Sequence, residues 1–105
     1  MARWLPKVIA RIHELAAAGR VSFTGKAIRE LEVLDLGFDE KDVRFVLEEL
    51  RSRDFSERLV SEHDGAWMYV FRPRVAHVLL YLKVVLRTSC VVVSFHEEGD
   101  DELTE

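Results

Sequence analysis

The stretch AHVLLYLKVVLRTSCVVVSFH, residues 76–96, decides the fold of this chain. It holds two runs of β-branched, leucine and aromatic residues, a composition typical of β-strands, on either side of a Thr-Ser pair. In the first run every even-numbered position is apolar, whereas the odd-numbered positions include Tyr81, Lys83 and Arg87. Because side chains alternate between the two faces of a strand, we expect the even set to face a core and the odd set to face outward.

A hairpin that turns at Thr88-Ser89 places Tyr81 opposite His96 and Lys83 opposite Ser94 on the outward face. The same register pairs Leu86 with Val91, Val84 with Val93 and Leu82 with Phe95 in the core, and Val85 with Val92 and Arg87 with Cys90 outside. A slip of one residue would bury Ser94 and His96. A two- or four-residue loop keeps this pairing, whereas a three- or five-residue loop would break it. The phenol and the imidazole are therefore expected to be direct neighbours.

The first 50 residues have the three- and four-residue spacing of amphipathic helices, in segments 5–19, 24–37 and 39–51. Thr24 and Asp39 are suited to cap the second and third helices. The period then changes to that of strands at 66–71 and, more weakly, at 54–63. Helices followed by strands predict an α+β domain in which N-terminal helices pack on a C-terminal antiparallel sheet. We assign residues 1–97 to one domain and residues 98–105 to an acidic tail, expected to be disordered.

Composition limits the function classes. With 105 residues, 49% hydrophobic and 32% charged, the chain is long enough for one globular core. Its apolar runs are too short to cross a membrane, and one cysteine excludes an internal disulfide or a cysteine zinc site. We therefore expect a cytoplasmic protein without a cofactor, a metal or a membrane partner.

Charge is distributed unevenly along the chain. The formal net charge is -4, but residues 65–96 carry four basic and no acidic side chains, and residues 97–105 carry six acidic ones. A polyanion meets the local patch rather than the net charge, because charges are screened over roughly 8 to 10 Å at physiological salt. The basic segment 65–96 is therefore compatible with a nucleic-acid partner, although the net charge is negative.

The outward face combines groups suited to a phosphodiester. Arg72 and Arg74 enter from the end of the preceding strand, beside Lys83. Cations can hold a phosphate and its transition-state charge, and a histidine, with a reference pKa of about 6.5, can move protons near neutral pH. With no carboxylate nearby, we predict that His96 transfers a proton, that Tyr81 orients it or the phosphate, and that no metal takes part.

The blocks FRPRVAHVLLYLKVVL and VVVSFHE resemble the C-terminal half of the motility quorum-sensing regulator (MqsR) toxins, whose pattern reads like Y-R-P-R, V-Y-L-K and I-V-S-F-K-E. The likeness extends backward through Trp67 and "SRDF" at 52–55 to the turn after the first helix. The resemblance implies a RelE-like α+β fold, a metal-independent endoribonuclease that cuts mRNA at short sequences typically centred on GCU, and a partner antitoxin.

The resemblance also implies site residues, with substitutions. The family tyrosine corresponds to Tyr81 and the family arginines to Arg72 and Arg74. The lysine that ends the last block is His96 here, and the glutamine after the tryptophan is Met68. The lysine after the Asp-Phe pair has no direct match, and Arg58 is the nearest cation. The expected sites are listed by role: catalytic His96, Tyr81 and Arg72; phosphate-binding Arg74, Lys83, Arg58 and Arg87; and substrate-positioning Met68 and Trp67.

Three functions compete. The first is a toxin endoribonuclease that attacks RNA through the ribose 2′-hydroxyl and stops translation, with mRNA and an antitoxin as partners. The second is a catalytically degenerate module that binds RNA or the antitoxin, which the loss of the family glutamine and of the family lysine favours. The third is an interaction domain that adds a partner strand to an exposed sheet edge. The acidic tail adds a further hypothesis, in which it folds over the arginines and competes with RNA.

Overall fold

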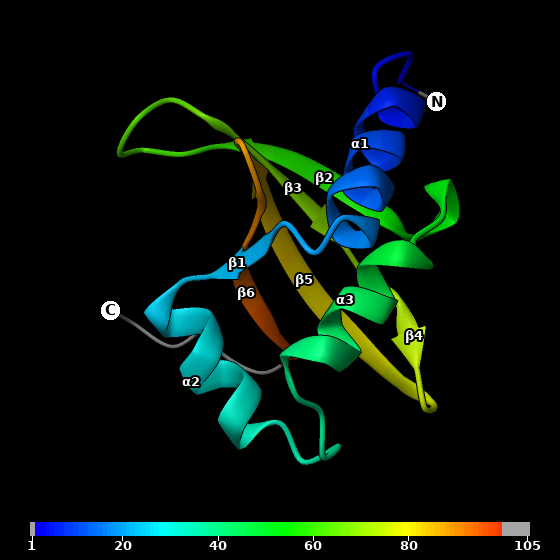
Figure 1. Ribbon diagram of the computed structural model, residues 1–105, viewed down its shortest axis with the longest axis vertical. Coiled ribbons are helices and arrows are strands. Elements are labelled where there is room, and N and C mark those ends of the chain that lie inside the picture. The colour runs from blue at the N-terminus through cyan, green and yellow to red at the C-terminus, as the bar shows by residue number, and fades with distance from the viewer. Residues whose placement is uncertain (1, 100–105) are drawn as a thin grey trace.

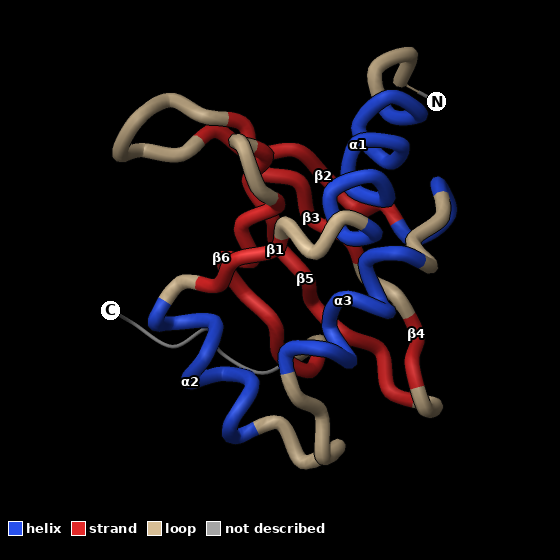
Figure 2. The backbone as a smooth tube through the Cα atoms, viewed as in Figure 1, coloured by secondary structure: helices blue, strands red, loops and turns tan. Residues whose placement is uncertain are grey.

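The computed structural model describes residues 2–99 (Figures 1 and 2). The elements run in the order α1 (Leu5–Ala17), β1 (Val21–Phe23), α2 (Gly25–Val33), α3 (Glu40–Glu48), a 3-10 turn (Ser52–Asp54), β2 (Phe55–Val60), β3 (Trp67–Phe71), β4 (Arg74–Val75), β5 (Val78–Leu86) and β6 (Cys90–Glu97). The predicted order of three helices followed by strands is confirmed. In the described range no helix is both long and apolar enough to cross a membrane.

The strands form one mixed sheet in the order β1-β6-β5-β3-β2, and β4 pairs with the start of β5. The pairs β2–β3, β3–β5 and β5–β6 are antiparallel. The α+β class is confirmed with one addition, because β1 lies parallel to β6. With only three residues, β1 is too short to show a strand period in the sequence.

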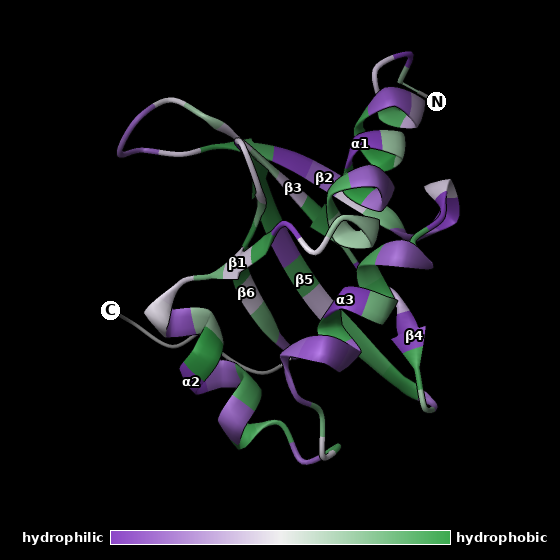
Figure 3. Cartoon of the chain, viewed as in Figure 1, coloured by the Kyte–Doolittle hydropathy of each residue, from purple (hydrophilic) through white to green (hydrophobic). Residues whose placement is uncertain are grey.

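The helices begin where the sequence predicts. The Thr24 side chain accepts a hydrogen bond from the Ala27 backbone N–H. Asp39 and Asp42 form a reciprocal capping box at the start of α3. Each cap satisfies backbone donors that the first helical turn leaves unpaired. Figure 3 shows that each helix carries both hydrophilic and hydrophobic residues, as expected for helices with one face on a core.

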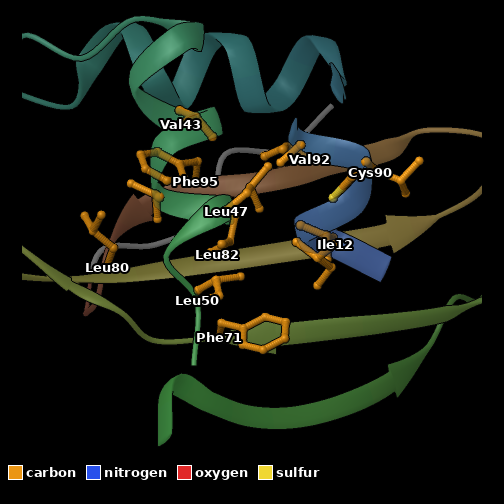
Figure 4. Close-up of a cluster of buried hydrophobic side chains, with 14 of the residues drawn as sticks. Ile12, Val43, Leu47, Leu50, Phe71, Leu80, Leu82, Cys90, Val92 and Phe95 are labelled. Atoms are coloured by element: carbon orange, nitrogen blue, oxygen red, sulfur yellow. The ribbon is translucent and has the colours of Figure 1, made fainter. Parts of the chain in front are cut away.

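Helices α1 and α3 cover one face of the sheet, and the core fills the space between them (Figure 4). Ile12 of α1 and Leu47 of α3 point toward Leu82 of β5 and Phe71 of β3, and all four are fully buried. Leu80 and Val84 are also fully buried, which confirms that the even-numbered positions of β5 face the core. The opposite, odd-numbered face is left for the site.

The β5–β6 register is as predicted at the site end and shifted at the turn end. Tyr81 opposes His96 and Lys83 opposes Ser94, but Leu86 opposes Cys90, so the turn has three residues. A bulge beside Val93 absorbs the extra residue. The prediction for the turn end was therefore wrong. Cys90 and Val92 face the core and are fully buried, whereas Val91 and Val93 are only partly buried.

Burial of Cys90 predicts an unreactive thiol. Burial raises the pKa of this thiol from 9.0 to about 12, so the reactive thiolate is scarce in the folded protein at neutral pH. A thiol reagent at pH 8 is expected to label Cys90 only in denaturant. The unfolded thiol ionises first as pH rises, so stability falls between pH 9 and about 12. Fast labelling of the native protein, followed by mass spectrometry, would contradict this burial.

Residues 76–77 form a turn instead of the predicted start of a strand. Val75 opposes Val78, so Ala76 and His77 are the two loop residues, and both have positive φ, 52° and 66°. This is the backbone of a type I′ turn, which matches the twist of a hairpin and favours Asn-Gly. The strand period of the sequence does not report φ, so the turn was missed.

Replacing Ala76-His77 by Asn-Gly is expected to stabilise the fold by about 1 kcal/mol, because asparagine and glycine adopt positive φ at less cost than alanine and histidine. Urea denaturation of the two proteins measures the difference. Thr88→Gly is the control, since Thr88 lies in the other hairpin turn and has no positive φ. There glycine should destabilise slightly. A loss of stability in the Asn-Gly protein would argue against the type I′ backbone.

Candidate functional site

The candidate site lies on the face of the sheet that α1 and α3 leave uncovered. The strand alternation directs Tyr81 and Lys83 of β5 and Ser94 and His96 of β6 to this open face. Arg72 follows the last residue of β3 and reaches the same face, since the preceding Phe71 points into the core. Three strands thus supply one cluster, because β5 pairs with both β3 and β6.

The rings of Tyr81 and His96 stack, with centroids 4.8 Å apart and planes 13° from parallel. The predicted meeting of phenol and imidazole is confirmed. The guanidinium carbon of Arg72 lies 5.4 Å from the centre of the Tyr81 ring, within the range of a cation–π contact. The three groups therefore form one cluster, here called the stack, in which the Tyr81 ring contacts both Arg72 and His96.

His96 is more buried than an outward position suggests, with 7% of its surface exposed. Its Nδ1 lies 2.9 Å from the Glu97 carbonyl oxygen, which can only accept, so Nδ1 carries the hydrogen. In the neutral ring Nε2 is then unprotonated. This Nε2 is buried and has no hydrogen-bond partner among residues 2–99. A buried nitrogen lone pair without a partner is unusual, and a small movement of the side chains that cover it would let it accept a proton from a bound molecule.

Arg72 is held from two sides. Its backbone N–H donates to the Asp54 carbonyl at 2.6 Å. Its side-chain Nε donates to a Glu98 carboxylate oxygen at 2.7 Å, with about a third of each side chain exposed. Glu98 is in turn anchored by its own backbone N–H, which donates to the Leu79 carbonyl. A carboxylate therefore occupies the Nε edge of the guanidinium that is expected to bind phosphate.

Two buried charged residues of α2 complete the site, and the sequence analysis missed both. Figure 1 shows α2 alongside β6, beyond the end of the short β1. There the Lys26 ammonium donates to the Val93 carbonyl at 3.3 Å and also to the Ser94 hydroxyl. Glu30 accepts the Phe95 N–H at 3.0 Å, and its carboxylate lies 3.6 Å from Lys26. Side chains of α2 thus replace a neighbouring strand along this part of β6.

A signal for this pair was present in the sequence. Lys26 and Glu30 are four residues apart, so they lie on one side of the helix, and Glu30 is next to the buried Leu31. Glu30 is also three residues from Ala27, which is fully buried. A charged pair bordering an apolar stripe predicts partners within the fold, because buried charges are almost always paired.

Two predicted site residues lie on the other face of the sheet. Arg58 opposes Tyr69, which packs against Trp4 on the helix side. The guanidinium of Arg58 lies between two indoles, 4.2 Å from the ring of Trp4 and 3.7 Å from that of Trp67. The structure therefore does not bring Arg58 or Trp67 to the stack, because the alternation of β2 and β3 turns both toward the helices.

Two more predicted phosphate-binding residues are set apart from the stack. Arg74 lines a separate hollow of about 240 Å³, with Arg51 and Arg53 beside the end of α3. Arg87 lies in the β5–β6 turn and pairs with Asp64, and this hydrogen bond lowers the pKa of Asp64 to about 2. Lys83 and Met68, by contrast, share the open face. Lys83 opposes Val70 of β3, and Met68 lies two residues before Val70 and so points to the same face.

The cluster has the chemistry of a phosphodiester site. In residues 2–99 no group of three or more His, Cys, Asp or Glu side chains is arranged to hold a metal ion. The stack offers a nitrogen base at His96, a phenol at Tyr81 and a guanidinium at Arg72. Next to it, Lys83 opposes Ser94, whose hydroxyl accepts a hydrogen bond from Lys26 of α2. These groups can move a proton and stabilise anionic charge.

Comparison with known proteins agrees with this chemistry. The sequence profile of the family described as "Motility quorum-sensing regulator, toxin of MqsA" matches residues 7–97. A curated relative, the mRNA interferase toxin MqsR of Escherichia coli (strain K12), is 30% identical over 91 residues. That alignment covers 86% of this chain and 91% of the relative. The matched region includes every residue of the stack.

Proposed function

The chain belongs to the family of motility quorum-sensing regulator toxins, and from this premise we propose that it is the toxin of a toxin–antitoxin pair and cleaves mRNA. The observation that carries the proposal is the Tyr81 ring, which stacks on His96 and also contacts the Arg72 guanidinium, with His96 Nε2 left without a hydrogen-bond partner in residues 2–99. Its partners would be mRNA and a cognate antitoxin. The relative's name supports both the substrate and the partner class.

The chemistry proposed for the stack needs no metal. RNA binding uncovers His96 Nε2, which accepts the proton of a ribose 2′-hydroxyl, and the 2′-oxygen attacks the adjacent phosphorus. Arg72 and Lys83 stabilise the pentacoordinate phosphorane, which carries more negative charge than the diester. The bond from phosphorus to the 5′-oxygen then breaks, and that oxygen takes up a proton from water or from the Tyr81 phenol. The products are a 2′,3′-cyclic phosphate and a 5′-hydroxyl end.

Incubation of the purified protein with a long RNA in EDTA tests this proposal. Discrete fragments with cyclic phosphate ends, detected by ligation-dependent end mapping, are the expected result. Cleavage that stops in EDTA and returns with Mg²⁺ would overturn the metal-free mechanism. Relief of growth arrest by the product of a neighbouring gene, with recovery of a complex of the two proteins, tests the antitoxin partnership.

Met68 supports a second candidate, a degenerate module that binds RNA or the antitoxin without cutting. Met68 lies on the open face, where its thioether is at most a weak hydrogen-bond acceptor. Arg58 is on the other face and does not replace the missing cation. Tight binding of RNA without fragments in the same EDTA assay would favour this function over the nuclease.

The Glu98 contact predicts self-competition. Replacing Glu98 by glutamine is expected to raise RNA affinity about threefold to tenfold at low salt, because a phosphate must displace the carboxylate to reach Arg72. Fluorescence anisotropy with a labelled RNA measures the change. Glu97→Gln is the matched control, since it removes the same charge from an exposed residue that opposes Leu80. Equal gains in both proteins would show a general charge effect and no competition.

A further inference from the structure

A groove of about 550 Å³ begins next to the stack on the open face. Four neighbouring strands line it, with Leu59 of β2 opposite Met68 of β3, followed by Lys83 of β5 and Val93 of β6. Lys26 of α2 also lines it. The volume is within the range of sites that hold small ligands, about 300 to 1,000 Å³.

The groove is continuous with the stack. Lys83 lines it and lies two residues from Tyr81 on the same face of β5, a separation of about 7 Å along a strand. Lys26 joins the two regions as well, since its ammonium contacts the Ser94 hydroxyl, and Ser94 is two residues from His96. A polymer bound across the stack therefore has a direct path into the groove.

The chemistry of the groove differs from that of the stack. Its lining includes the apolar Leu59 and Val93 and the thioether of Met68, which makes favourable contacts with aromatic faces. It also includes polar groups of the β2–β3 turn, Ser61, Glu62 and His63, which can donate to and accept from the edge of a planar ring. Lys83 supplies a cation for a flanking phosphate, whereas Lys26 is buried and paired with Glu30. Apolar side chains, polar turn residues and one lysine together fit a nucleotide with its base inserted.

We infer that this groove binds an unpaired nucleobase of the RNA, one that flanks the phosphate held at Arg72. The inference rests on the proposed function for its substrate class. Single-stranded RNA is recognised through bases that are splayed out and stacked on side chains, with hydrogen bonds to their edges. The replacement of the family glutamine by Met68 then exchanges a hydrogen bond for a stacking surface. The groove therefore helps to choose the cut site in this chain.

Binding of two uncleavable RNAs to three proteins tests the groove. The RNAs are a short 2′-O-methyl oligoribonucleotide of mixed sequence and the same oligomer with every base removed. We expect base removal to weaken binding to the unaltered protein about tenfold, as typical of base stacking. Met68→Ala should weaken binding of the intact oligomer several-fold and leave the abasic oligomer unchanged. Phe45→Ala, an exposed apolar residue on α3, is the control and should change neither affinity.

Each result has a defined meaning. Equal weakening of both oligomers by Met68→Ala, or no effect of base removal, would overturn the base-binding groove. Tighter binding of polyglutamate than of the intact oligomer, lost in Met68→Ala, would assign the groove to an acidic peptide instead. The cleavage assay on unmodified RNA is read separately. Base-dependent binding without cleavage refutes the nuclease and keeps the groove, whereas cleavage with base-independent binding refutes the groove alone.

Discussion

Replacing His96 by alanine is expected to lower the rate of RNA cleavage by about 10² to 10⁴-fold, the range for loss of an acid–base residue. The reason is the position of the imidazole, which stacks on the Tyr81 ring and whose Nε2 has no hydrogen-bond partner in residues 2–99. RNA affinity should change little, because Arg72 and Lys83 remain. Single-turnover cleavage of a labelled RNA, together with anisotropy, separates the two effects.

His77→Ala is the matched control for that experiment. His77 is an exposed histidine in the β4–β5 turn, outside both the stack and the groove, and its removal should leave the rate of the chemical step unchanged. Because His96 is buried, circular dichroism and the melting temperature of His96→Ala must be compared with those of the unaltered protein. A folded His96→Ala protein that cleaves at the original rate would remove His96 from the mechanism.

Replacing Glu30 by alanine is expected to lower the free energy of unfolding by about 3 to 5 kcal/mol, the usual cost of removing one partner of a buried ion pair. Glu30 is 1% exposed, accepts the Phe95 N–H and faces Lys26. Alanine would leave a backbone donor without its acceptor and an ammonium without its counter-charge. Urea denaturation followed by tryptophan fluorescence measures the loss.

Glu32→Ala provides the comparison on the same helix. Glu32 is exposed and lies two residues along α2, so its loss should change stability by less than about 0.5 kcal/mol. Glu30→Gln keeps an oxygen that can accept from Phe95 and should cost less than Glu30→Ala. Similar stabilities for the Glu30→Ala and Glu32→Ala proteins would show that α2 does not hold the edge of β6.

The sequence predicted the class of the fold and the meeting of Tyr81 with His96, because both follow from local periodicity. The alternation of β5 places its even positions inward, and the paired residues nearest the site agree with it. What periodicity cannot report is the number of residues in a turn, so the bulge beside Val93 and the burial of Cys90 were missed. A bulge adds one residue to a strand without changing the order of residue types in the sequence. The residues beyond the bulge then point to the opposite face of the sheet.

The site was predicted in part for the same reason. Arg72 and Lys83 lie where strand order places them, next to or along β5. Arg58 and Trp67 were expected at the site because the resemblance matches positions in the sequence and does not say which face of the sheet a side chain occupies. The structure shows the two side chains stacked on the helix side. Lys26 and Glu30 come from another element more than 60 residues away, and only their contacts with Val93, Ser94 and Phe95 reveal them.

The α2 side chains along β6 also limit how this molecule can assemble. Over residues 93–95 they occupy the hydrogen-bonding positions that a further strand would need, and the adjoining β1 is only three residues long. Of the two outer strands in the described sheet, β2 is therefore the one whose edge can pair with a further strand. A sheet that can be extended on one side alone lets two copies pair edge to edge, and strand addition at this sheet then stops at the pair.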